Sequence, residues 1–448
     1  MLLEKVRTPG NRPSLPFAMA AVVVGVAILL VVVQIVAMAA GFQGPLTSLA
    51  GDFVATPKSA SVPWAGLALA LVGISARRRV IALAAAVGID IVFAAVRAFR
   101  GGVLTVGNGP TIVLTGLVLI AWLRWSGADR RNALHAAGLG ALLILATKIG
   151  DTWLHFTANA LPNVWDQYAL VADRALGSPS WVLGRAVEAA GPVGYNVLHW
   201  VYIELPVAAI AVAIWQLRNV ASTGIWPTHY LVRTFLVLGL IGPVIYMLFP
   251  VVGPIFAFGS EGGAYSMGDY WPDVNPPIDQ PQPMPFDDFT PRNCMPSMHT
   301  AWALALFLHS RRGPVWLRWG GTVWLLCTLT ATLGFGYHYG VDLIVGAMLC
   351  LTVESALRDP ERGWGWFRIR LVGGGALAFA GLMLSYRLLA ETLAEHPAPS
   401  GILLVGVLAA MVAGYWVTFF PPAWWSRGDD DASSTPELSQ GELVDRAV

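Results

Sequence analysis

The chain has 448 residues, of which 56% are hydrophobic and only 12% are charged, about half the roughly 25% that is usual in a soluble domain. The mean hydropathy is +0.61 and the formal net charge is +1. These values exclude a disordered chain and indicate no surface for polyanions, so nucleic acid is not an expected partner. They predict an all-α polytopic membrane protein rather than a soluble enzyme.

Apolar segments along the chain predict about twelve membrane spans, since a helix needs about 20 apolar residues to cross a hydrocarbon layer of about 30 Å. The first of them carries no charge and follows a basic leader. Its apolar run is too long for a signal peptide, so we expect a membrane anchor. The predicted spans are residues 16–40, 62–75, 80–96, 111–122, 133–156, 193–217, 234–258, 295–310, 320–335, 341–357, 371–390 and 402–420.

Basic residues fall mainly on alternate loops, and such loops lie on the cytoplasmic side of a membrane. This pattern predicts that both termini are cytoplasmic and that the two longest loops face the extracytoplasmic side. Arginine supplies 25 of the 28 basic residues, which points to a bacterial protein and hence to an inner membrane. The basic regions are the N-terminus and residues 77–79, 124–131, 218–233, 311–318 and 358–370.

The longest irregular stretch, residues 259–293, contains seven prolines and six acidic residues. A loop of this length is usually either functional or disordered, so it is either an ordered cap or a flexible connector. Its acidic residues do not have the spacing of a calcium loop. The polar tail, residues 421–448, is expected to be a disordered cytoplasmic segment.

A polar motif follows this stretch directly. Proline and serine at 296 and 297 precede an apolar run, which is typical of a helix start, where free N–H groups attract anions. His299 then lies about one turn inside the outer end of a span.

A second polar motif lies at the next outward-facing end, about forty residues later. His338 and Asp342 are four residues apart, so a helix places them on one face within hydrogen-bonding reach. A carboxylate on one imidazole nitrogen leaves the other free to act as a nucleophile. The predicted topology therefore brings two histidines and one aspartate to the same membrane face.

These two motifs resemble those of the type-2 phosphatidic acid phosphatase superfamily. Residues 294–299, Cys-Met-Pro-Ser-Met-His, look like its Pro-Ser-x-His motif, and the pair His338 and Asp342 looks like its final motif. The resemblance implies a six-helix core over residues 133–358, with outside loops 158–192 and 259–294. Residues 1–132 and 359–420 are then accessory membrane helices.

The same resemblance implies a role for each matching residue. His338 matches the nucleophile that receives the phosphoryl group, and Asp342 matches the carboxylate that orients it. His299 matches the general acid that protonates the leaving oxygen. Ser297 matches a phosphate-contacting residue. Such enzymes use no metal and no cofactor.

The chain departs from the superfamily pattern at two positions. Thr332 stands where an arginine usually precedes the final histidine by six residues. The stretch 246–254 has no cation where the first motif should lie. Together with residues 202–206, this stretch looks more like the inositol phosphorylceramide synthase branch, whose members move a phosphorylated head group between lipids. The acceptor is therefore either water or an alcohol.

Phosphate chemistry requires positive charge, because the phosphate oxygens repel a nucleophile. Arg292, seven residues before His299, is the first candidate for phosphate contact, followed by Arg174 and Arg185 in the other long outside loop. Lys148 is a further candidate, although it lies three residues before Asp151 and either forms a structural ion pair with it or belongs to the site.

The three cysteines fit no metal or disulfide spacing. Cys327 and Cys350 lie in apolar runs and are expected to pack in the core. Cys294, beside the first histidine motif, is interpreted as a small packing residue rather than a reactive thiol.

The leading hypothesis is a metal-independent lipid phosphate phosphatase or phospho-head-group transferase, working through a phosphohistidine at the extracytoplasmic face. Its partners are a lipid phosphate and, for transfer, an alcohol acceptor. A lipid transporter or flippase is the second hypothesis, but polar residues then should line both halves of a pathway. A membrane scaffold without catalysis is the third.

Overall fold

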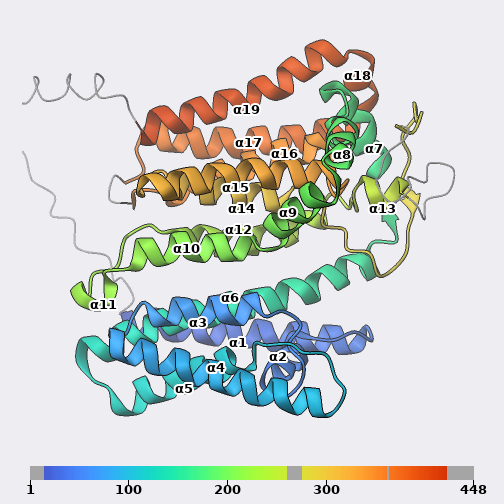
Figure 1. Ribbon diagram of the computed structural model, residues 1–448. Helices are drawn as coiled ribbons and strands as arrows, with labels where there is room; N and C mark the ends of the chain where they lie inside the picture. The colour runs from blue at the N-terminus through green and yellow to red at the C-terminus, as the bar shows by residue number, and fades with distance from the viewer. Residues whose placement is uncertain (1–14, 260–274, 361–362, 421–448) are drawn as a thin grey trace, which may run out of the picture.

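The computed structural model describes residues 15–259, 275–360 and 363–420 (Figure 1). Nearly all described elements are helices, which confirms the predicted all-α membrane fold. Among the described residues, six helices have the length and composition needed to cross a membrane. Several other apolar helices are shorter than 18 residues, so the total of about twelve spans stays a prediction. The N-terminal leader and the tail 421–448 lie outside the described residues.

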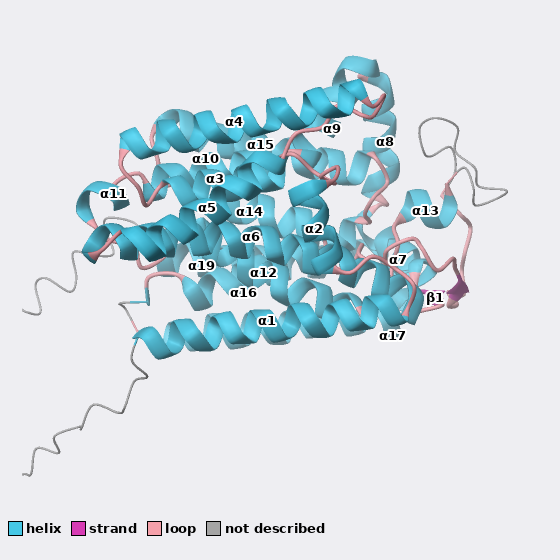
Figure 2. Cartoon of the chain, turned by 90° about the horizontal axis from the view of Figure 1, so that it is seen from below, coloured by secondary structure: helices cyan, strands magenta, loops and turns pink. Residues whose placement is uncertain are grey.

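The first six helices form one layer, which lies below the rest of the molecule in Figure 1 and is seen from its outer side in Figure 2. Its core consists of small and branched side chains, among them Leu67, Leu114 and Ile144. The helices are α1 (Leu15–Ala39), α2 (Pro45–Val54), α3 (Ser61–Leu71), α4 (Ala76–Phe99), α5 (Asn108–Arg124) and α6 (Gly127–Ala160).

Two glycines allow α3 and α6 to pack with their backbones in contact. A Cβ atom on Gly140 would lie 2.1 Å from the carbonyl oxygen of Gly66, and one on Gly66 would lie 2.9 Å from that of Gly140. Small residues of this kind allow close helix packing in membranes, where apolar burial gives no driving force between helices. This contact fixes α3 against α6, and both helices line the cavity described below.

The remaining helices form a second layer, whose large core joins α7, α10, α12, α14, α16, α17 and α19. These elements are α7 (Asp166–Asp173), η1 (Arg174–Leu176), α8 (Pro179–Ala189), α9 (Gly191–Ile203), α10 (Leu205–Leu217), α11 (Val220–Thr223), α12 (Leu231–Tyr246), α13 (Pro254–Phe258), α14 (Met298–Ser310), α15 (Val315–Gly334), α16 (Gly340–Leu357), α17 (Trp366–Leu388), α18 (Ala390–Glu395) and α19 (Pro397–Phe419).

Two of the predicted spans are interrupted. The span 193–217 is divided at Glu204 into α9 and α10, because Pro206 lacks an N–H and its ring clashes with the preceding turn of a continuous helix. The span 234–258 is helical only to Tyr246. An irregular segment with Pro250 and a left-handed Gly253 (φ 104°) separates it from α13. Both interruptions lie at the end of the molecule that carries the histidine motifs.

The two long loops meet at this same end. Strand β1 (Asn163–Val164) pairs antiparallel with β2 (Met284–Pro285), and the short helices α7, α8 and α13 gather around them (right side of Figure 1). Within residues 275–293 of the predicted cap, strand β2 is therefore held by strand β1 of the other long loop. Residues 260–274 lie outside the described residues.

A buried polar cluster lies near the opposite end of the second layer. Glu354 accepts hydrogen bonds at Oε1 from His309 (2.8 Å) and at Oε2 from His229 (3.2 Å). The Gln216 oxygen accepts the N–H of Leu231, so its amide nitrogen faces Nδ1 of His309, at 2.9 Å. His309 thus accepts at Nδ1 and carries its proton on Nε2, toward Glu354. The cluster joins α10, α12, α14 and α16 by hydrogen bonds.

We predict that Gly140→Leu destabilises the protein by about 1–3 kcal/mol, because the new side chain must displace the Gly66 backbone. Thermal unfolding of the detergent-solubilised protein measures the effect. Gly138→Leu is the matched control on the same helix, since a Cβ there meets nothing within 4 Å. Equal stability of the two variants would contradict the close approach of α3 and α6.

Candidate active site

The second histidine motif forms a compact buried cluster. Nδ1 of His338 lies 3.4 Å from Oδ2 of Asp342, and their side chains are only 5% and 0% exposed. The Cys294 thiol donates to the same carboxylate oxygen at 2.6 Å and lies 3.4 Å from Nδ1 of His338. Nε2 of His338 has no hydrogen-bond partner among the described residues. The ring therefore presents one nitrogen to the carboxylate and leaves the other available.

Cys294 was interpreted from the sequence as a packing residue, and this interpretation was incomplete. Its side chain contacts both members of the His338–Asp342 pair, and its thiol also lies 3.4 Å from the Tyr337 carbonyl oxygen. The sequence feature that could have indicated this contact is the position of Cys294 immediately before the Met-Pro-Ser-Met-His run. Cys350 is buried as expected, and Cys327 is partly exposed.

Asp342 is held by the start of its own helix. The Tyr339 N–H donates to Oδ2 at 2.9 Å, in the manner of a capping carboxylate at the third helical position. The Asp342 carbonyl accepts the N–H of Ser297 at 3.2 Å. A Cβ on Gly346 would lie 2.4 Å from the Ser297 carbonyl oxygen, so only glycine permits this approach. The starts of α14 and α16 are therefore locked side by side.

His299 is positioned by a tyrosine from the interrupted span. The Tyr202 hydroxyl lies 3.0 Å from Nδ1 of His299, and the two rings stack with centroids 3.9 Å apart. Tyr202 lies just before the break at Glu204, so the interruption brings its ring to α14. A histidine that acts as general acid carries protons on both ring nitrogens, so Nδ1–H of His299 then donates to the Tyr202 oxygen and Nε2–H faces the site.

Ser297 is fully buried and acts as the N-cap of α14. Its Oγ accepts from the Thr300 N–H at 3.3 Å and from the Thr300 hydroxyl at 3.0 Å. The predicted helix start is confirmed at this residue. The Ser297 hydroxyl is thus bonded within its own helix, while its backbone N–H donates to the Asp342 carbonyl of α16.

Two aspartates of α7, which sequence reasoning missed, hold the backbone around the site. Asp166 accepts the N–H groups of Val252 (3.1 Å) and Gly253 (2.9 Å) and the Tyr339 hydroxyl (2.9 Å). Asp173 accepts the Val341 N–H at 3.0 Å. Burial raises the pKa of Asp166 to about 6 and that of Asp173 to about 8. Both lie in the predicted outside loop 158–192, but nothing in their spacing marked them.

Arg292 is completely buried and binds the loop that carries it. Its guanidinium donates to the carbonyl oxygens of Leu161, Thr290 and Asp287, with Nε 3.2 Å from the Leu161 oxygen. These carbonyls occupy the donors that a phosphate would need. The structure therefore gives no support to Arg292 as the first phosphate contact and assigns it to joining the two long loops.

The other predicted cations are also engaged elsewhere. Arg174 pairs with Asp279 at 3.4 Å, and Arg185 is exposed on α8. Lys148 forms a buried ion pair with Asp52 of α2 at 2.8 Å. The considered pair of Lys148 with Asp151 was therefore wrong, because α2 approaches α6 and brings a closer carboxylate. Asp151 pairs instead with Lys58 at 3.0 Å.

A cavity of about 640 Å³ is lined by both motif histidines, His299 from α14 and His338 from the turn between α15 and α16. It lies between α3 and α6 of the first layer and α10, α12 and α14 of the second. His199 of α9 also lines it, and this residue was not predicted. Its lining residues, all described, include no lysine or arginine.

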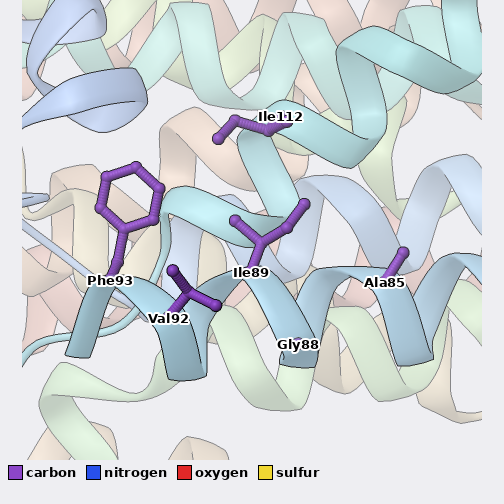
Figure 3. Close-up of a pocket in the computed structure, with 6 residues that line it drawn as sticks. All are labelled: Ala85, Gly88, Ile89, Val92, Phe93 and Ile112. Atoms are coloured by element: carbon purple, nitrogen blue, oxygen red, sulfur yellow. The ribbon is translucent and has the colours of Figure 1, made fainter. Parts of the chain in front are cut away.

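A shallower hollow lies on α4 and α5 (Figure 3). Its six lining residues are all apolar or glycine, and none belongs to either histidine motif. It therefore has no group that acts on a phosphate.

Comparison with protein families separates the two parts of the chain. Residues 170–355 match the family described as the PAP2 superfamily. This match contains both histidine motifs and supports the resemblance to the phosphatidic acid phosphatase superfamily and a phosphatase-type enzyme activity. Residues 17–156 match a family described as a domain of unknown function (DUF5933). Comparison with curated proteins gave no match, and neither did comparison with solved structures.

The boundary between the two parts falls near the end of α6. The first half of α6 packs into the first layer with α3 and α5, while Trp153 in its second half donates to the Pro243 carbonyl of α12 at 2.7 Å. The predicted boundary after residue 132, which gives α6 to the PAP2 core, thus remains a prediction.

We predict that Cys294→Ala lowers kcat about tenfold with little change in KM, because Asp342 loses a hydrogen bond worth about 1 kcal/mol or more. Cys294→Ser, which keeps a donor, should recover much of the loss. Cys327→Ala is the control, since it lies in α15 outside the cluster. Unchanged kcat in Cys294→Ala would restore the packing interpretation.

We predict a pH effect on stability from Asp173. Burial raises the pKa of Asp173 in the folded protein, so the folded state binds the proton more tightly than the unfolded chain does. The contribution of Asp173 to the free energy of unfolding is therefore present below pH about 4 and is lost as the pH rises through about 8. Asp173→Asn should therefore flatten the decline of the melting temperature between pH 5 and 8. A decline identical to that of the wild type would contradict the raised pKa.

Proposed function

We propose that the protein is an integral membrane phosphatase or phosphotransferase that acts on a lipid phosphate through a phosphohistidine, without a metal. One observation carries this proposal. His338, with Nδ1 beside Asp342, lines the same cavity as His299, with Nδ1 at Tyr202; His338 lies in the turn before α16 and His299 in α14. The match of residues 170–355 to the PAP2 superfamily supports the same class of chemistry.

The proposed first step forms a bond between Nε2 of His338 and phosphorus. The bond from phosphorus to the leaving oxygen breaks, and that oxygen takes the proton of His299. Asp342 stabilises the positive charge that develops on the His338 ring. In the second step an acceptor hydroxyl gives its proton to His299 and attacks the phosphohistidine, which regenerates His338.

The start of α14 is the proposed source of positive potential for the phosphate. Its first N–H groups lie at the site, and a helix N-terminus favours an anion. In this proposal Arg292 shapes the loop above the site, Arg174 holds the other long loop through Asp279, and Lys148 holds α2 against α6 through Asp52.

The proposed orientation places this site at the extracytoplasmic face of a bacterial inner membrane, with about twelve spans and both termini cytoplasmic. Basic residues at the opposite ends of the second-layer helices support it, since α14 is followed by Arg311 and Arg312 and α16 by Arg358. The predicted PAP2 core over 133–358 and the flanking accessory helices belong to this proposal.

The acceptor in the second step decides between hydrolysis and head-group transfer. The interrupted span with Tyr202, and the absence of a cation in residues 246–254, are the features similar to the inositol phosphorylceramide synthase branch. Phosphoinositol-type head-group transfer to a lipid alcohol is therefore the proposed alternative to hydrolysis. Turnover in ¹⁸O-labelled water separates the two, because hydrolysis alone places the label in released phosphate.

We predict that His338→Ala reduces turnover of lipid phosphates to background and that His299→Ala lowers it about 10²–10⁴-fold, because each removes one partner of the proton and phosphoryl transfer. Activity of the purified protein is measured on phosphatidic acid, polyprenyl pyrophosphate and phosphatidylinositol, with mass detection of products. His155→Ala is the control, since His155 packs against Phe42 outside the cavity. Wild-type activity of His338→Ala on every substrate would exclude the proposed mechanism.

A further inference from the structure

The cavity that holds the histidines extends far beyond them. It is lined along the whole of α12, from Leu231 at the start to Tyr246 at the end. These sixteen residues span about 22 Å at 1.5 Å per residue, which is most of the roughly 30 Å hydrocarbon thickness of a bilayer. A phosphate group alone occupies only a small part of such a length.

The polarity of the lining changes along this length. At the site end the wall contains His299, His338, Tyr202 and Asn293. The rest of the wall is mostly apolar, with Leu69, Leu143, Ile210, Leu231, Val232 and Leu236 toward the start of α12. It also contains two polar residues of α6, Thr147 and Asp151, and Asp151 is paired with Lys58. A site with a polar end and a long apolar body is complementary to an amphiphile whose head group reacts.

Packed side chains border the cavity near the start of α12. Leu69 and Val232 of the wall belong to a buried cluster with Leu139, Ala213 and Leu217. This cluster joins α3 and α6 of the first layer to α10 and α12 of the second. In the proposal below it forms the floor that limits the depth of the cavity.

We propose that this cavity binds the hydrocarbon chain of the lipid phosphate and that the N-terminal layer, through α3 and α6, supplies one wall and selects chain length. The proposal rests on the proposed function for the reaction at its polar end. In this proposal the N-terminal layer, which matches the domain of unknown function, selects the substrate by its chain. Its residues do not contact the phosphate.

Selection between hydrocarbon chains must arise from the shape of the cavity. A chain that leaves the bilayer exchanges one apolar environment for another, so burial alone provides little gain. Close packing and the floor therefore determine which chains fit, and a bulky side chain in the wall should act by exclusion. Gly150 of α6 lines the cavity, and a Cβ there meets nothing within 4 Å, so a new side chain has open space to enter.

The test compares Gly150→Trp with Gly138→Trp, two replacements of glycine on the same helix that differ in whether the position lines the cavity. Gly150→Trp should lower kcat/KM for dioleoyl phosphatidic acid and a long polyprenyl phosphate by about tenfold or more, because the chain no longer fits. Activity on water-soluble dihexanoyl phosphatidic acid should change less than about threefold. Different losses on the acyl and polyprenyl substrates identify which chain the cavity fits.

Gly138→Trp should leave all these activities near those of the wild type. An equal loss on short and long substrates in Gly150→Trp, or no loss on either, would overturn the proposal.

A binding measurement separates this proposal from the proposed function. Phosphatidic acid with a photoreactive group at the chain end is crosslinked to the protein, and labelled peptides are identified by mass spectrometry. Label on Leu69, Leu231 or Leu236 that disappears in Gly150→Trp supports the chain site even if the protein turns over no phosphate ester. Label confined to the α4–α5 hollow of Figure 3 would overturn it.

Discussion

The Asp342 carboxylate is the interaction on which the rest of the site depends. One oxygen receives the Tyr339 N–H and the Cys294 thiol and lies beside His338, while its backbone carbonyl receives the Ser297 N–H. A single residue at the start of α16 thus orients one histidine and positions the helix that carries the other. Burying a carboxylate without hydrogen-bond donors costs free energy, so the geometry of the site depends on these donors.

Interrupted helices give this site its shape. The break at Glu204 brings Tyr202 to His299, and the irregular segment after Tyr246 brings two N–H groups to Asp166. Irregular backbone at membrane depth requires hydrogen-bond partners from the protein, because lipid supplies none. Asp166 and Asp173 provide these partners from a short helix that does not span the membrane.

The contact between the two layers brings helices of the N-terminal layer to the cavity that contains the histidines. Gly66 and Gly140 bring α3 and α6 together, and the resulting pair forms the wall opposite α12. The histidines and the apolar body of the cavity belong to one continuous space. In the proposals above, the reaction at its polar end and the selection of the chain along its length belong to different parts of the chain.

Sequence reasoning succeeded where a residue's role follows from local periodicity or spacing. The helix start at residues 296–297 and the apolar helices follow from rules that act over a few residues. His338 and Asp342 are close as predicted, but they do not share a helix face, because His338 lies in the turn before α16. Sequence reasoning did not indicate the partners of the cations, because a basic residue near a motif in sequence is equally able to bind a carbonyl or a distant carboxylate. Arg292 binds three loop carbonyls, and Lys148 pairs with Asp52, nearly a hundred residues away.

The sequence alone therefore determined the fold class, the two histidine motifs and the closeness of His338 to Asp342, because these depend on hydrophobic length and on short spacing along the chain. Tertiary structure alone decided that Cys294 donates to Asp342, that Tyr202 holds His299, and that α3 and α6 complete the cavity. Each of these contacts joins residues far apart in the chain. No local pattern encodes which helices pack together, because that choice depends on the shapes of all the surfaces at once.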